Sequence, residues 1–243
     1  MTARTGRPPG HRDTMEFPAD LTAARRVQRE VRQHVVTGRT IGTGEIRYVA
    51  GADAAYSADR VYAAVVVMTF PALEDVAQAC AVREITFPYI PGLLAFCEGP
   101  ALADAFHKLP LRPDILFLNG HGHAHPLRAG LASHVGVVLD LATIGVARRL
   151  LTGTTAVPAG DRGPAVPVTD AGEVIGMAVR AREGAQPVYV SAGHRTDLSQ
   201  AVELVLRTTT THRFPEPLRR ADVLSRKCRR EHPVGAGNDG TRS

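Results

Sequence analysis

Three polar side chains lie in segments that could position them for metal chemistry. Asp53 is midway along an apolar, strand-like segment, Glu98 is on a helical segment, and Asn119 ends a second apolar strand. Two carboxylates and an amide carbonyl are hard oxygen ligands of the kind that Mg²⁺ prefers. A dication held there could polarise a phosphate and lower the pKa of a water molecule, which is the chemistry of phosphodiester hydrolysis. We therefore expect Mg²⁺ at this site, with Mn²⁺ as a substitute.

Each of these residues also has a simpler structural interpretation. Asp53 follows Gly51 closely and could be an edge or turn residue, and Glu98 could be an ordinary solvated helical glutamate. The pair Asn119-Gly120 is common in turns because both residue types tolerate positive φ. The residue types alone therefore leave a structural role open for all three positions.

Three histidines at alternate positions follow this turn, namely His121, His123 and His125. Alternate residues share one face of a strand, so three imidazoles could bind zinc or copper. The intervening glycines favour a loop instead, and neither a cysteine nor a fourth histidine lies near them in the sequence. We expect a loop rather than an all-histidine metal site.

The composition bounds the class of protein. The 243 residues carry a net charge of +5, which favours a polyanionic partner weakly because much of the excess lies near the two ends. Three cysteines without metal-type spacing predict reduced thiols in a cytoplasmic protein rather than a disulfide framework. The longest apolar runs have strand length, which argues against a membrane span. We expect a monomer.

The pattern of apolar residues predicts one mixed α/β domain over residues 16–226, with disordered tails at 1–15 and 227–243. Residues 153–172 are rich in Gly, Pro and Thr and are expected to form a long loop. The interruption at Gly99-Pro100 predicts a helix break. The predicted helices are 21–35, 91–96, 101–109, 132–141 and 198–206, and the predicted strands are 46–55, 61–70, 76–85, 115–118, 143–147, 174–179 and 187–191.

Several motifs are informative only in combination. In order and spacing they resemble those of endonuclease V, from residue 21 to residue 221. The motifs are Gly51-Ala-Asp-x-x-Tyr56, Pro88-Tyr-Ile-Pro-Gly-Leu-Leu-x-Phe-x-Glu98, Asn119-Gly-His-Gly-x-Ala-His-Pro126, Thr143-Ile-Gly-Val-Ala147 and Gly193-His-Arg195. The second and third are long and specific.

The resemblance implies an RNase H-like fold, in which a mixed central sheet with an antiparallel three-strand meander is flanked by helices. It also implies a DNA-repair endonuclease that recognises deaminated bases, chiefly hypoxanthine as inosine or deoxyinosine. With Mg²⁺ such an enzyme hydrolyses the second phosphodiester bond on the 3′ side of the damaged base. The expected partner is DNA that contains deaminated bases, with RNA as an alternative.

The resemblance also assigns roles to single residues. Asp53 and Glu98 match two metal ligands, and His125 matches a histidine beside the scissile phosphate. Tyr89 matches the tyrosine of a wedge that holds the strands apart while the damaged base is flipped into a pocket. A proline-stiffened loop that only packs on the core is the structural alternative. The residues expected to contact nucleic acid are Tyr89, Ile90, Pro91, Gly92, Gly120, His121 and Gly122.

Two catalytic positions depart from the family pattern. Asn119 stands where the family has a metal-binding aspartate, so the site loses one negative charge. Arg148 replaces a lysine, which keeps the charge but offers no available proton. Two interpretations follow: a Mg²⁺-dependent nuclease with weakened cleavage, or a protein that binds nucleic acid with deaminated bases without cutting it.

Overall fold

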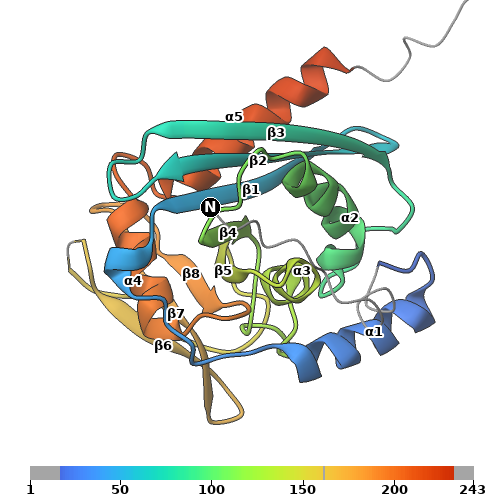
Figure 1. Ribbon diagram of the computed structural model, residues 1–243. Coiled ribbons are helices and arrows are strands. Elements are labelled where there is room, and N and C mark those ends of the chain that lie inside the picture. The colour runs from blue at the N-terminus through green and yellow to red at the C-terminus, as the bar shows by residue number, and fades with distance from the viewer. Residues whose placement is uncertain (1–16, 161, 233–243) are drawn as a thin grey trace, which may run out of the picture.

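A mixed sheet of eight strands forms the centre of residues 17–160 and 162–232, the part of the chain that the computed structural model describes. The strand order across the sheet is β3-β2-β1-β4-β5-β8-β7-β6 (Figure 1). The strands are β1 (Tyr48–Tyr56), β2 (Arg60–Thr69), β3 (Asp75–Glu84), β4 (Ile115–Asn119), β5 (Ala142–Ala147), β6 (Ala165–Asp170), β7 (Glu173–Val179) and β8 (Val188–Ala192).

The predicted antiparallel meander is confirmed, because β2 pairs antiparallel with both β1 and β3. Strand β1 also pairs in parallel with β4, and β4 pairs in parallel with β5. The register sets Ala52 opposite Leu118, so the next residues, Asp53 and Asn119, follow at matching positions. The carboxyl ends of these parallel strands therefore bring together two side chains that are far apart in the sequence.

Helices cover both faces of the sheet (Figure 1). On one face, α2 and α3 bury the small side chains of β1 such as Ala50 and Ala52, and α1 packs outside α3. On the other face, α4 and α5 pack against alternate residues such as Val49. The helices are α1 (Leu21–His34), α2 (Leu94–His107), α3 (Leu131–Leu139), α4 (Leu198–Thr208) and α5 (Glu216–Glu231), with a short 3₁₀ helix η2 (Thr43–Glu45).

Gly51 permits the close approach of α5 to β1. A Cβ atom at this position would lie 2.1 Å from the carbonyl carbon of Pro217 and 2.4 Å from the backbone nitrogen of Leu218. No side chain fits such a gap. Because Gly51 and Asp53 are two residues apart on the strand, they share a face, and the helix that Gly51 admits therefore also passes Asp53.

The predicted helix break at Gly99-Pro100 is wrong. Helix α2 continues from Leu94 to His107 with Pro100 inside it. A proline removes one backbone donor from a helix, but buried apolar residues on both sides, such as Phe96 and Leu102, hold the two halves against the sheet. One continuous helix therefore carries Glu98 within its length rather than at its end.

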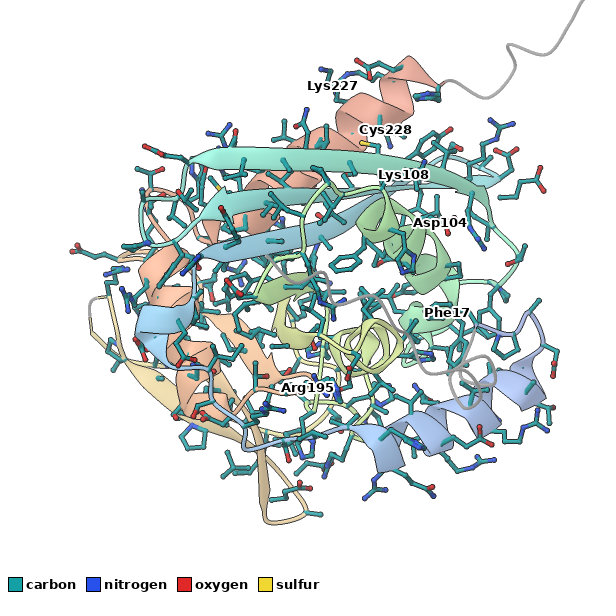
Figure 2. All side chains as sticks on the ribbon, in the orientation of Figure 1. Phe17, Asp104, Lys108, Arg195, Lys227 and Cys228 are labelled. Atoms are coloured by element: carbon teal, nitrogen blue, oxygen red, sulfur yellow. The ribbon has the colours of Figure 1, made fainter. Side chains whose placement is uncertain are left out.

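Two further predictions are corrected at the C-terminal side. The expected loop at 153–172 contains β6, an edge strand that tolerates Pro167 because an edge residue need not donate to a neighbour. Residue 227 does not begin a disordered tail, since α5 extends to Glu231. Cys228 lies against the sheet, whereas Lys227 points outward (Figure 2). The expected tail at 1–15 lies outside the described residues, as do residues 233–243.

The chemistry of the cysteines agrees with the prediction. Cys80, Cys97 and Cys228 are all free thiols in the structure. Within residues 17–160 and 162–232, none of the helices has both the length and the apolar character needed to cross a membrane.

Candidate metal centre and nucleic-acid interface

Asp53 and Asn119 are in direct contact between the inner strands β1 and β4, at the point where β4 ends. Asn119 Nδ2 donates a hydrogen bond of 3.0 Å to Asp53 Oδ1, which also accepts the backbone N–H of Ala54 at 2.9 Å. Asp53 is 6% exposed and belongs to a strand with neighbours on both sides. This position excludes the simpler interpretation of Asp53 as an edge or turn residue.

Glu98 reaches the same region from helix α2. Its side chain is buried, and the Tyr56 hydroxyl donates a hydrogen bond of 2.6 Å to Oε1 of Glu98. Tyr56 ends strand β1, three residues after Asp53. Strand β1 therefore carries both Asp53 and the hydrogen-bond donor to Glu98. The burial of Glu98 excludes a solvated surface glutamate.

Burial raises the pKa of both carboxyl groups. It raises the pKa of Asp53 to about 6, and the hydrogen bonds from Asn119 and Ala54 oppose this effect because they favour the charged form. It raises the pKa of Glu98 to about 8, where the nearby charge of Asp53 adds to the effect and the bond from Tyr56 opposes it. A cation beside these carboxylates would relieve the cost of ionising them.

The three side chains fit a hard divalent cation by donor type. Asp53 and Glu98 offer carboxylate oxygens and Asn119 offers an amide carbonyl. In the observed rotamer the nitrogen of Asn119 faces Asp53, so ligation through oxygen requires the amide to turn over. Over the described ranges, no group of three or more His, Cys, Asp or Glu side chains could hold a metal ion.

Asp222 on helix α5 is an acid that the sequence analysis missed. A cavity of about 200 Å³, which we call the carboxylate cavity, is lined by residues that include Asp53, Asn119, Arg148, Phe214 and Asp222. The charge of Asp222 contributes to the raised pKa of Asp53, and Arg226 pairs with Asp222 at 2.8 Å. Helix α5 therefore brings a third carboxylate toward the two that the sequence had indicated.

A usable signal for Asp222 was present in the sequence. Leu218, Ala221, Ser225 and Cys228 are buried at helical spacing, which defines an amphipathic helix. Asp222 lies four residues after Leu218 and three before Ser225, at the margin of this buried stripe. The basic run at 226–230 is typical of a tail, and it masks the helical spacing of the buried residues in α5.

A second cavity of about 510 Å³, which we call the loop cavity, opens beside the expected wedge. It is lined by five of the seven residues expected to contact nucleic acid, and also by His125, Asn119 and Arg148. Because Asn119 and Arg148 line the carboxylate cavity as well, the two cavities adjoin. The five expected residues are Tyr89, Pro91, Gly92, Gly120 and His121.

Residues 88–92, the expected wedge, which we call the wedge turn, divide into an exposed and an anchored part. Tyr89 is 68% exposed although it is a large aromatic residue, whereas Ile90 packs against the apolar cluster beneath α1. Gly92 has a φ of +84° and completes a tight turn, in which the Leu93 N–H donates to the Ile90 carbonyl at 2.8 Å. Gly122, also expected to contact nucleic acid, does not line the loop cavity and packs on the backbone of Ala192.

The three histidines of the 119–130 loop point to different partners, as expected of a loop rather than a metal site. His121 lines the loop cavity, and burial lowers its pKa to about 4. His123 Nε2 lies 2.7 Å from Glu173 Oε1 on strand β7. His125 is buried and contacts the wedge turn through Gly92.

Both ring nitrogens of His125 are engaged. Nδ1 accepts the Leu127 N–H at 3.0 Å, so the ring proton is on Nε2, which donates to the Gly92 carbonyl at 2.8 Å. Burial also lowers the pKa of His125, which favours this neutral form. Contact between His125 and a phosphate, the role expected from the sequence, would require one of these two hydrogen bonds to open.

Two arginines near the site have different surroundings. The Arg148 guanidinium lies 4.7 Å from the centre of the Phe214 ring, and its charge helps to lower the pKa of Asp53. Arg128 is bound to Asp170 at 2.9 Å and to Glu173 at 2.7 Å, with 12% of its side chain exposed. Arg148 is therefore placed to meet an anion, whereas Arg128 holds the 119–130 loop to β6 and β7.

Most of the sequence matches known proteins. The pattern of the endonuclease V family matches residues 29–223. Endonuclease V of Roseiflexus sp. is 48% identical over 209 residues, which cover 86% of this chain and 93% of that protein. These matches span the acids, the wedge and the 119–130 loop together.

Solved structures give the same result. The crystal structure of endonuclease V from Streptomyces avermitilis has a TM-score of 0.84 and 43% identity, and the match covers 88% of this chain and 95% of that chain. Ciona intestinalis endonuclease V, solved with a 24mer DNA containing an inosine followed by a ribo-adenosine, has a TM-score of 0.76 and 27% identity, over 87% and 98%. The likeness confirms the expected RNase H-like fold. In sequence and in fold, the chain belongs to the endonuclease V family.

Proposed function

We propose that the chain is a metal-dependent endonuclease that recognises hypoxanthine in DNA and cleaves the backbone on the 3′ side of this base. The observation that carries the proposal is the common wall of the two cavities. Asn119 and Arg148 line the loop cavity beside Tyr89 and also the carboxylate cavity beside Asp53. A base flipped into the loop cavity would therefore leave a neighbouring phosphate close to the buried acids.

Asp53, Glu98 and Asn119 are the residues that would hold Mg²⁺, or Mn²⁺ in its place. When bound, such an ion polarises the phosphate and lowers the pKa of a water molecule. Asp53 and Glu98 must both be ionised to bind it, and their raised pKa values make this dependent on pH. Asp222 is close enough to add negative charge to the site from helix α5.

The other residues act on the nucleic acid. Arg148 offers a permanent positive charge between the two cavities and suits a phosphate oxygen. Tyr89 offers an exposed aromatic ring on a turn stiffened by Pro88 and Pro91, so it can enter a base stack at little entropic cost. The loop cavity beside it has the volume of an ordinary small-molecule site.

A second candidate function is recognition without cleavage. The observation that favours it is the bond from the Asn119 amide to Asp53, because this bond satisfies Asp53 with a neutral donor where the family pattern has a carboxylate. In both functions the loop cavity and Tyr89 would recognise the base in the same way. The two functions therefore differ at the metal centre alone.

The test is cleavage and binding of an end-labelled duplex with one deoxyinosine, beside the same duplex with deoxyadenosine and an inosine-containing RNA. Each substrate is incubated with the native chain, Asp53→Asn or Asp104→Asn, in Mg²⁺, Mn²⁺ or a chelator. Asp104 is a carboxylate on α2 that pairs with Arg83 at the surface, so its variant controls for lost charge.

We expect the native chain and Asp104→Asn to cut only the deoxyinosine duplex, at the second phosphodiester bond 3′ to the base, and only with metal. Asp53→Asn should bind this duplex but not cut it. Selective binding by the native chain without cutting would establish the second candidate instead. Equal binding of the deoxyinosine and deoxyadenosine duplexes would overturn both functions, and a preference for the RNA would replace DNA as the substrate.

A further inference from the structure

Helix α1 buries one polar side chain beneath the wedge turn. Its buried residues are Ala24, Val27, Gln28 and Val31, and Gln28 is only 2% exposed. The three apolar residues among them belong to the buried cluster that includes Phe87 and Phe96. A buried amide is costly unless its hydrogen bonds are made, so the contacts of Gln28 indicate what it does.

The amide of Gln28 joins two loops that are far apart in the sequence. Its Nε2 donates to the Gly92 carbonyl at 2.7 Å and to the Ala129 carbonyl at 3.1 Å, which uses both of its protons. His125 Nε2 lies 3.4 Å from the same nitrogen and donates to the same Gly92 carbonyl. The wedge turn, the 119–130 loop and α1 thus meet at one carbonyl group, that of Gly92.

This junction lies at the wall of the loop cavity. Gly92 and His125 line the cavity, as does Gly130, the residue after Ala129. Gly92 is also the left-handed residue that ends the turn bearing Tyr89, and a Cβ atom at Gly92 would lie 3.3 Å from His125 Nε2. Any change in the distance between Gly92 and Ala129 would therefore alter both the cavity and the direction of the turn.

We propose that Gln28 is a positioning residue that, together with His125, holds the wedge turn at a fixed distance from the 119–130 loop. Gln28 does not itself line the loop cavity, and it acts through the carbonyl groups of Gly92 and Ala129. In this arrangement His125 serves the turn as a neutral donor, and the pair keeps Tyr89 in place for the moment when a duplex is opened. The proposal rests on the proposed recognition of a flipped base.

The chain contains a matched control for the loss of a buried amide. Gln200 on α4 is 6% exposed, and its side chain both donates to and accepts from the backbone of Ile41. It does not line either cavity. Gln200→Leu should therefore cost stability as Gln28→Leu does, without any effect on the wedge. Gln33→Leu, on the exposed side of α1, controls for changes of the helix itself.

The binding experiment compares dissociation constants for a deoxyinosine duplex and for the same oligonucleotide as a single strand, in chelator so that no cleavage occurs. Gln28→Leu should weaken duplex binding about tenfold, the effect of one or two lost hydrogen bonds, and single-strand binding much less. Gln28→Glu should also weaken duplex binding, because a carboxyl group has at most one O–H and cannot donate to both carbonyl groups. Both control variants should keep the native ratio of the two constants.

A second measurement needs no nucleic acid. The chain has no tryptophan, so Tyr89→Trp supplies a single tryptophan, whose fluorescence can be excited apart from that of the remaining tyrosines. Its anisotropy should fall when Gln28→Leu is added and stay unchanged when Gln200→Leu is added. An unchanged anisotropy in the Gln28→Leu background would overturn the proposal. So would equal losses of duplex and single-strand binding. If the native chain showed no preference for deoxyinosine, the proposed function would be refuted, but the anisotropy result would still test the positioning role of Gln28.

Discussion

The side-chain amide of Asn119 donates a hydrogen bond of 3.0 Å to Oδ1 of Asp53. This bond lowers the pKa of Asp53 and so opposes the effect of burial. A carboxylate at position 119 would reverse the relationship, because two negative charges would then face each other unless a cation separated them. Asparagine at position 119 thus provides a contact with Asp53 that needs no metal, whereas aspartate would provide the negative charge that attracts one.

Asn119→Asp should therefore destabilise the metal-free protein and strengthen its dependence on metal. We expect a lower melting temperature in chelator, a larger gain in melting temperature on adding Mg²⁺, and cleavage faster by at least about tenfold. Binding of the deoxyinosine duplex in chelator should change little, since Tyr89 and the loop cavity are intact. Equal cleavage rates for the two chains at saturating Mg²⁺ would contradict this expectation.

Glu98→Gln should raise the stability of the metal-free protein in a way that depends on pH. The pKa of Glu98 rises from 4.5 to about 8 on folding, so its favourable contribution is complete below pH 4.5 and is lost as the pH rises toward 8. Glutamine does not titrate. The melting temperature of the variant minus that of the native chain should grow between pH 4.5 and 8.5. Glu84→Gln, at an exposed position, is the control for the loss of a negative charge.

Gly51→Ala tests whether the close approach of α5 matters. The added methyl group would lie 2.1 Å from the carbonyl carbon of Pro217, and overpacking of this kind costs about 1–3 kcal/mol of unfolding free energy or more. We expect a clear fall in stability together with weaker metal binding, because Asp222 moves with the helix. Gly44→Ala is the matched control, since a Cβ atom there meets nothing within 4 Å. Similar melting curves for the two variants would contradict this account.

The residues that sequence analysis placed correctly are those with a strong local signal. Asp53 is a charged residue inside an apolar strand, and Asn119 ends another strand, so each was recognisable from its own neighbours. Their contact depends on the parallel pairing of β1 with β4, which the residue pattern alone did not specify. The motif resemblance therefore provided what the local signals could not.

The features that were missed arise from long-range packing. His125 and Gly92 are 33 positions apart, and Gln28 and Ala129 are 101 positions apart, so no local pattern predicts their bonds. The unbroken helix α2 also depends on burial against the sheet, which overrides the helix-breaking tendency of Pro100. In each case tertiary contacts decide the outcome.

The basic face of α1 should contribute to the salt dependence of DNA binding. Arg25 and Arg32 are exposed and flank Gln28 at three and four positions, on the side of α1 nearest the wedge turn. If they contact phosphates, reversing both charges should reduce the slope of log K against log salt by about 0.9 for each contact. The same reversal of Arg182 and Arg230, which are also exposed, is the control. An unchanged slope would show that this face of α1 is solvated and does not contact phosphates.

Tyr89→Ala should weaken binding at a deoxyinosine inside a duplex more than at the same base in a single strand. Tyr89 is 68% exposed and lines the loop cavity, so its ring is free to enter a base stack. Opening a paired duplex costs a few kcal/mol, and a single strand does not require this step. We expect a loss of about tenfold or more for the duplex in paired titrations at one salt concentration.

Tyr89→Phe separates the ring from its hydroxyl group. Stacking needs only the aromatic face, so the phenylalanine variant should bind both substrates as the native chain does. Melting curves complete the test, because an exposed side chain contributes little to stability and its removal should leave the melting temperature nearly unchanged. A uniform loss of binding on duplex and single strand, together with a lower melting temperature, would show that Tyr89 is a packing residue and not a wedge.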